Sequence, residues 1–200
     1  MNDCDYILIT DASVRKLGDS SDNHAAYAVI VLNPTTNKYV LFTEYLGKKS
    51  ILYSEGCAIV RGLDFIKKKK KKKNVSVVVF TDSQITVDIM THHIFKWDKT
   101  IPKRWRNKSG KLVKNQKLYA KMYSYLTNKC YDVKACHIPA HMRVKDGKAV
   151  QKYLTDTANI NLTEKTAKCL IQLNNLADHY ARQMTKNPLN MQVVGQEKSV

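Results

Sequence analysis

The chain has 200 residues, of which 44% are hydrophobic, an ordinary proportion for a globular protein. This composition excludes collagen-like, mucin-like and wholly disordered chains, and its longest apolar run, Val75–Phe80, is too short to cross a bilayer. Thirty-four Lys and Arg against 17 Asp and Glu give a formal net charge of +17. Since an excess of this sign attracts polyanions, nucleic acid is the partner that the composition favours.

An anionic membrane surface is the second partner compatible with this charge, but no basic amphipathic stretch with an aromatic face supports it. The segment Met1–Asp5 carries acids and lacks the basic-then-apolar order of a secretory signal. The five cysteines are widely spaced without a C-x-x-C pair, which argues against a disulfide framework or a structural zinc site. We therefore expect a cytoplasmic protein that does not contact a membrane.

The first third of the chain predicts an antiparallel meander followed by a helix. The three short apolar runs that indicate strands are Tyr6–Thr10, Ala26–Leu32 and Tyr39–Tyr45. The polar segment Val14–His24 between the first two is expected to be a loop. Apolar residues then recur at helical spacing over Ile51–Lys70, and Ser50 stands at the expected N-cap.

The remainder of the chain alternates strands and helices. Apolar, β-branched Val75–Thr81 is typical of a strand buried on both faces. The further expected elements are a short helix at Gln84–Met90, a helix at Asn115–Thr127, a strand at Tyr131–Ile138 and a last helix at Leu170–Met184. This order predicts one α/β domain over residues 1–185, with a five-stranded mixed sheet flanked by helices, and a loose C-terminal tail over residues 186–200.

Two segments fall outside this order of elements. Residues 95–110 interleave aromatic and basic side chains, so their cations can pair with phosphates while Trp97 and Trp105 offer stacking faces. A core role for the two tryptophans is the alternative. Residues 142–172, between the last predicted strand and the last predicted helix, are called the insertion below, and they either form a lid over a functional site or run over the surface. The lysine run Lys67–Lys73 is either a solvated helix end or a contact with nucleic acid.

Four acids stand at positions where a sheet could gather them. Asp11 directly follows the first predicted strand and Asp82 the fourth, while Glu55 lies in the second turn of a helix and Asp178 in the last helix. If the two strands are neighbours that end at one edge, the carboxylates meet there and repel each other. A divalent cation removes that conflict, and hard oxygen ligands favour Mg²⁺ or Mn²⁺ over zinc. Two such ions can activate a water for in-line attack on phosphate.

Residues 95–110 resemble the basic protrusion of bacterial-type ribonuclease H, and five further motifs in this order resemble type 1 ribonuclease H of that kind. They are Ile9–Ser13 (ITDAS), Ser54–Ile59 (SEGCAI), Thr81–Gln84 (TDSQ), His137–His141 (HIPAH) and Asn174–Arg182 (NNLADHYAR). The resemblance covers residues 5–185 and implies the ribonuclease H-like fold, with the first three strands antiparallel and the last two parallel to the first. It also implies endonucleolytic hydrolysis of the RNA strand of RNA–DNA hybrids, which leaves 5′-phosphates. The implied metal ligands, for two Mg²⁺ ions, are Asp11, Glu55, Asp82 and Asp178.

The resemblance assigns roles to further residues. His141 matches a mobile histidine that assists proton transfer or product release, which suits an imidazole because its charge changes near neutral pH. Asn174, four residues before Asp178, projects from the same helix face and is expected to contact substrate or the groups around it. The other expected substrate contacts are Ser13, Ser54, Gln84, Trp97, Lys103, Arg104, Trp105, Arg106 and Lys114. Where the family commonly has amide side chains that bind the hybrid, this chain has Ile51-Leu52-Tyr53.

Two other classes of function compete with this interpretation. A transposase- or resolvase-like nuclease of the same fold also places acids after the first and fourth strands, but Glu55 and His141 argue against it. A non-catalytic nucleic-acid-binding module would gain nothing from four acids beside phosphate. We therefore expect a free-standing, monomeric ribonuclease H.

Overall fold

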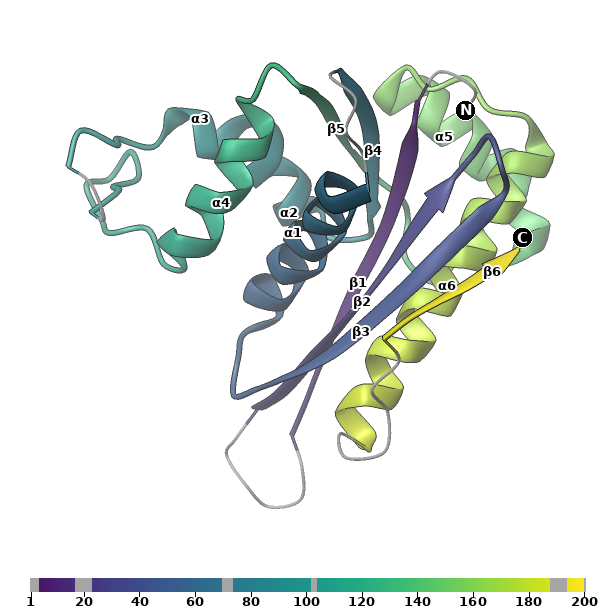
Figure 1. Cartoon of the computed structure of the whole chain (residues 1–200), viewed down its shortest axis with the longest axis horizontal. Helices are drawn as coiled ribbons and strands as arrows, with labels where there is room; N and C mark the ends of the chain where they lie inside the picture. Colours follow the sequence, from purple (N-terminus) through teal and green to yellow (C-terminus); the bar gives the residue numbers. More distant parts are fainter. Residues whose placement is uncertain (1–3, 17–22, 70–73, 102–103, 188–193, 200) are drawn as a thin grey trace.

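A computed structural model of the chain shows a six-stranded mixed sheet with helices on both faces (Figure 1). The structure describes residues 4–16, 23–69, 74–101, 104–187 and 194–199. The strands are β1 (Tyr6–Lys16), β2 (Asn23–Asn33), β3 (Lys38–Gly47), β4 (Val75–Thr81), β5 (Tyr131–His137) and β6 (Val194–Ser199), in the sheet order β5-β4-β1-β2-β3-β6. The first three strands are antiparallel, whereas β4 and β5 run parallel to β1. The predicted α/β fold class is thus confirmed.

The sixth strand corrects the prediction of a loose tail over residues 186–200. β6 pairs antiparallel with β3, from Lys38 opposite Ser199 to Phe42 opposite Val194. The sequence of β6 has no alternation of apolar and polar residues, so the pattern did not predict a strand there. The strand forms because backbone hydrogen bonds between two strands do not require such alternation. The free edge of β3 provides the partner.

The predicted loop Val14–His24 is largely an extension of two strands. β1 continues to Lys16 and β2 begins at Asn23, and these two residues are partners in the antiparallel register. Residues 17–22 lie outside the described part of the chain. The sequence pattern did not predict this extension because its side chains are polar. Backbone hydrogen bonds between β1 and β2 hold these two strands together beyond the buried part of the sheet.

One face of the sheet is covered by α1 (Ile51–Lys69), α2 (Gln84–Asp88), the π-helical turn η1 (Ile89–His93), α3 (Ile94–Lys96) and α4 (Gln116–Leu126). Ser50 caps α1 as predicted, because its Oγ accepts a hydrogen bond from the backbone N–H of Tyr53 at 3.2 Å. Gly62 permits close packing, since a Cβ there would lie 2.9 Å from the side chain of Leu8 in β1. The α1 helix therefore lies directly on the central strand.

The other face carries the 3₁₀ turn η2 (Val144–Asp146), α5 (Gly147–Ala158) and α6 (Glu164–Lys186). The last helix begins at Glu164 rather than at the predicted Leu170, and Thr163 caps it by accepting from the backbone N–H of Thr166. Within the described residues, no helix has both the length and the apolar character needed to span a bilayer.

The insertion at residues 142–172 is part of the core and is neither a lid nor a surface excursion. Val150 and Leu154 of α5 are completely buried and belong to the same apolar cluster as Ile7 and Ile9 of β1. Leu8, between these two strand residues, faces the opposite cluster around α1. The central strand is therefore buried on both faces, and α5 supplies part of the second layer.

This role of α5 predicts a large effect of truncating its buried side chains. Leu154→Ala is expected to lower the free energy of unfolding by about 2–5 kcal/mol, because it removes buried methyl groups and leaves a cavity. Val144→Ala is the matched control, since Val144 is 37% exposed, and it should change stability by less than about 0.5 kcal/mol. Denaturant unfolding of the three proteins measures both values, and equal effects would contradict a core role for α5.

Candidate active site

Two adjacent parallel strands set the positions of the first two carboxylates. Thr10 of β1 is the register partner of Thr81 of β4, so the next residues along each strand, Asp11 and Asp82, emerge side by side. Asp82 directly follows β4, as predicted. Asp11 lies within β1 rather than after it, because this strand continues into the ribbon with β2.

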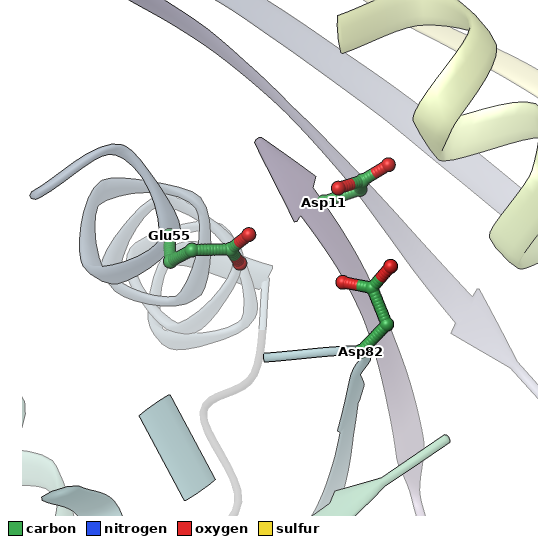
Figure 2. Close-up of side chains that lie close together, drawn as sticks. All are labelled: Asp11, Glu55 and Asp82. Atoms are coloured by element: carbon green, nitrogen blue, oxygen red, sulfur yellow. The ribbon is translucent and has the colours of Figure 1, made fainter. Parts of the chain in front are cut away.

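A third carboxylate completes a compact cluster. Asp11, Glu55 and Asp82 each offer a carboxylate oxygen, and these oxygens lie within 4.8 Å of one another. Figure 2 shows Glu55 reaching from α1 toward the space between the two aspartates. Asp11 and Glu55 are only 4% and 3% exposed, whereas Asp82 is half-buried. Three acids from three separate elements therefore share one small, mostly buried space.

Burial and mutual repulsion make these carboxylates hard to ionise. Burial raises the pKa of Asp11 to about 8, and the nearby charges of Asp82 and Asp178 add to the shift. Burial, followed by the charges of Asp11 and Asp82, raises the pKa of Glu55 well above its usual value. The pKa of Asp82 is also raised, first by burial and then by Asp178. The cluster thus favours any species that brings positive charge.

The donor set fits a divalent cation. Asp11 Oδ2 is buried and has no hydrogen-bond partner among the described residues, and Glu55 Oε2 accepts a long hydrogen bond, 3.3 Å, from the Thr81 hydroxyl. A buried oxygen without a partner carries a desolvation cost that a ligated cation would remove. Because all the donors are carboxylates, the residues match hard cations such as Mg²⁺ and Mn²⁺.

Asp178 approaches the cluster from the opposite wall. It lies on α6, is partly exposed and forms an ion pair in which its Oδ1 is 2.5 Å from Arg182 Nε. It is not one of the three acids whose oxygens meet within 4.8 Å. Its charge and a hydrogen bond nevertheless raise the pKa of Asp11, so it acts on the same site. The structure places it at the margin of the cluster.

The four acids line an open cleft of about 560 Å³. Ser13 and His141, two further residues expected at the site, also line it. His141 is exposed, and its backbone has a left-handed φ of 56°, a strained conformation that recurs at functional sites. Residues that the sequence reasoning missed complete the lining, namely Arg15, Ile51, Ser83, Arg182, Thr185 and Lys186. Arg182 had a signal in the sequence, since it follows Asp178 at the i, i+4 spacing of a helical ion pair.

Three predicted substrate contacts do not line this cleft. Ser54 is completely buried, and its hydroxyl donates a hydrogen bond to the backbone carbonyl of Ser50, one turn earlier in the chain. Asn174 is 4% exposed and sits in the interior beneath Asp178 on α6. Gln84 lies in a separate groove beside β5, where it donates to Asp88 at 2.9 Å. For Ser54 and Asn174, helical geometry turns the side chain toward the core, so neither side chain is exposed in the cleft.

The tryptophans of residues 95–110 pack against each other and against α4. Trp105 is 8% exposed, and its ring lies 6.3 Å from that of Trp97 and 5.9 Å from that of Tyr123. Trp97 also contacts Tyr119, at 5.2 Å between ring centroids. Trp105 therefore has the core role, because a buried ring cannot stack on a base, whereas Trp97 is half-buried and packs against the same core.

This aromatic core presents basic side chains to solvent. Arg104, Arg106 and Lys114 are exposed, while Lys103 lies outside the described residues. In the lysine run, Lys67–Lys69 form the exposed last turn of α1, and residues 70–73 lie outside the described part. Figure 1 shows the segment between α3 and α4 projecting away from the sheet.

Comparison with known proteins finds one family and a common fold. The sequence model of the family "RNase H" matches residues 3–186. A search of curated protein sequences finds no match. Among solved structures, a foamy virus protease–reverse transcriptase in complex with an RNA/DNA hybrid is 15% identical with a TM-score of 0.64, over 91% of this chain and 20% of that one.

Two RNase H1 structures match over more than three quarters of their own length. LC11-RNase H1, isolated from compost by a metagenomic approach, is 16% identical with a TM-score of 0.54, over 92% of this chain and 98% of that one. LC9-RNase H1, described as a type 1 RNase H with the type 2 active-site motif, is 16% identical with a TM-score of 0.55, over 98% and 77% of the two chains. At these identities the structures show a shared fold. The chain spans about 20% of the length of the foamy virus protein.

The raised pKa values predict how the metal-free protein responds to pH. The pKa of Asp11 is about 8 in the folded protein and near 4 in the unfolded chain. Protonation of Asp11 therefore stabilises the fold, and this contribution to the free energy of unfolding is complete below about pH 4 and is lost as pH rises through about 8. In EDTA, the Tm of the wild-type protein is expected to fall across this window. Asp11→Asn should flatten the decline and raise Tm at pH 8.

Addition of Mg²⁺ gives a second test of the same site. It is expected to raise the Tm of the wild-type protein at pH 8, because a ligand that binds only the folded state stabilises it, and to raise that of Asp11→Asn much less. Asp156→Asn, which removes an exposed acid of α5, should behave like the wild type. Thermal scans with EDTA and with Mg²⁺ measure both effects, and a wild-type Tm that responds to neither pH nor Mg²⁺ would contradict the assignment.

Proposed function

This chain belongs to the ribonuclease H family, whose model covers nearly all of it, and from that membership we propose that it hydrolyses the RNA strand of RNA–DNA hybrids. The observation that carries the proposal is the buried cluster of Asp11, Glu55 and Asp82 where the parallel pairing of β1 with β4 ends, with Asp178 lining the same cleft. The hybrid bound to the foamy virus relative of this fold supports the choice of substrate. We propose endonucleolytic cleavage that leaves 5′-phosphates.

The four carboxylates would hold two Mg²⁺ ions, with Mn²⁺ as the alternative. When bound, such ions supply the positive charge that activates a water nucleophile and stabilises the leaving oxygen of the phosphodiester. The chain's own contribution is to fix the carboxylate oxygens in place before any cation arrives. Burial of Asp11 and Glu55 and the rigid pairing of β1 with β4 do this.

His141 is the residue best placed to move a proton at the rim of the cleft. It is exposed and lines the same cleft as Asp82 and Asp178, and its charge lowers the pKa of Asp82. An imidazole can take or release a proton near neutral pH, which suits transfer to a leaving oxygen or assistance to product release.

We expect the substrate to contact two regions, the rim of the cleft and the basic protrusion, which is residues 95–110 with the adjoining Lys114. Arg15 and Lys186 line the cleft as cations that can pair with the phosphates flanking the scissile bond. Ser13 offers a hydroxyl there, and Ile51, 46% exposed, provides an apolar surface for a sugar face. Arg104, Arg106 and Lys114 extend the basic surface beyond the cleft, so binding would depend strongly on salt.

Removal of one clustered acid tests the chemistry directly. Asp82→Asn is expected to lower Mg²⁺-dependent cleavage of a labelled RNA–DNA hybrid by about 10³-fold or more, because the amide keeps the shape but loses the charge. Asp156→Asn, an exposed acid on α5, serves as the control and should keep wild-type activity.

The same assay separates the competing functions when RNA duplex, DNA duplex and branched DNA are run beside the hybrid. Preference for branched or duplex DNA would indicate a transposase- or resolvase-like nuclease of this fold. Hybrid binding without turnover in Mg²⁺ or Mn²⁺ would indicate a binding module. Full activity in both Asp11→Asn and Asp82→Asn would overturn the assignment of the site.

The protrusion is predicted to affect binding rather than chemistry. Arg104→Ala and Lys114→Ala together should raise KM by about three- to tenfold, leave kcat near the wild-type value and reduce the salt dependence of binding, since each removes a phosphate contact. Lys165→Ala, an exposed lysine in the first turn of α6, removes positive charge elsewhere and is the control. Steady-state kinetics at two salt concentrations measure this, and an unchanged KM would show that the protrusion does not touch the hybrid.

A further inference from the structure

The outer edge of β5 is available for another strand. In the sheet order β5 is terminal, and within the described residues it pairs with β4 alone. An edge strand presents backbone N–H and C=O groups that readily pair with an added strand. Proteins usually cover or shorten such an edge, but β5 spans Tyr131–His137, the same length as its partner.

A groove of about 530 Å³ runs along this edge. Its floor includes Val133–His137 of β5, and Figure 1 shows this strand at the border of the sheet, with α2 to α4 to one side and α5 to the other. The first wall includes Val87, Met90, Phe95 and Leu126, and the second includes Tyr153, Thr157, Ala158 and Ile160. Part of the first wall is the π-helical turn η1, a feature frequent at functional sites.

Exposed apolar surface in the groove indicates a protein ligand. Phe95 is 48% exposed although it lies against Tyr123, with 5.9 Å between the ring centroids. The charged side chains in the lining are Asp88 and Lys134, with the histidines His92 and His137. One lysine beside an aspartate cannot follow a phosphate backbone, which requires a row of cations. The lining therefore favours a peptide over a nucleic acid.

We propose that this groove binds an extended, acidic segment of another protein, which adds to the sheet as a seventh strand beside β5. Backbone hydrogen bonds to the free edge would provide affinity, and the two walls would select side chains that alternate along the added strand. Val133 and Ala135 pack on the same apolar cluster as Met90, so apolar residues of the partner would face that wall. This groove shares no lining residue with the cleft of the four acids.

Charge selects the acidic partner. Lys134 is exposed at the middle of β5 and, among the described residues, forms no ion pair. Opposite charges directly across a strand pair stabilise it, so an acidic residue facing Lys134 would be preferred. The net charge of +17 adds a longer-range attraction for an acidic chain.

The same features disfavour a second copy of this chain. The edge lies at the bottom of a groove with a helical wall on each face, and the β5 edge of a second copy would bring its own helices against those walls. Two molecules that each carry +17 also repel one another. A single extended segment is narrow enough to enter the groove.

Selection of peptides on the full chain tests the proposal. Random dodecapeptides displayed on phage are selected on the protein, and the recovered sequences are synthesised with a fluorophore. We expect sequences that alternate apolar residues with Asp or Glu, and bound peptide should slow hydrogen exchange at the backbone amides of residues 133–136. Lys134→Glu should weaken binding by about tenfold or more, and Phe95→Ala should also weaken it.

Lys117→Glu is the matched control, since it makes the same charge change on an exposed residue at the opposite end of α4 from Leu126. It should alter peptide affinity by less than about twofold, and both charge variants should cleave the hybrid at the wild-type rate. The proposal is wrong if recovered peptides leave the β5 amides unprotected or if the two charge variants bind equally well. It is also wrong if the hybrid displaces the peptides from the groove, or if β5 becomes protected with rising protein concentration as a dimer forms.

Discussion

Mutual repulsion among buried carboxylates is the constraint around which this protein is built. Asp11 and Asp82 stand together because β1 and β4 are parallel neighbours in register, and no local preference of either residue favours this arrangement. Raised pKa values measure how unfavourable their ionisation is. Strand pairing and packing elsewhere must offset this cost, and a bound cation would convert it into binding energy. Stability and metal affinity are thus coupled through the same oxygens.

The two-layered core is what holds the acids against that repulsion. Leu8 faces α1 while Ile7 and Ile9 face α5 and α6, so the strand that carries Asp11 is fixed from both sides. Gly62 lets α1 lie close to β1, which brings Glu55 within reach of the cluster. Because α5 lies within residues 142–172, this segment forms part of the second core layer. It positions the site without lining it.

Sequence patterns predicted what depends on burial and missed what depends on backbone pairing or on the direction of a side chain. The apolar runs identified β1 to β5 and the acids beside them, because a buried strand must be apolar. β6 and the ends of β1 and β2 are polar and paired by backbone, so no side-chain pattern revealed them. Ser54 and Trp105 are polar or amphipathic types often found at substrates, yet each faces the interior. Position along the chain did not decide their orientation.

The distribution of charge separates binding from chemistry in this molecule. The chain carries +17, yet four acids line its cleft, so a phosphate and this carboxylate cluster would repel each other. Attraction must then come from cations set away from the cluster, such as Arg15 and Lys186 at the rim and Arg104 on the protrusion. A divalent cation would be the one component that favours both the carboxylates and the phosphate. Without it, the basic surface would still attract a nucleic acid, but any phosphate in the cleft would be repelled by the carboxylates.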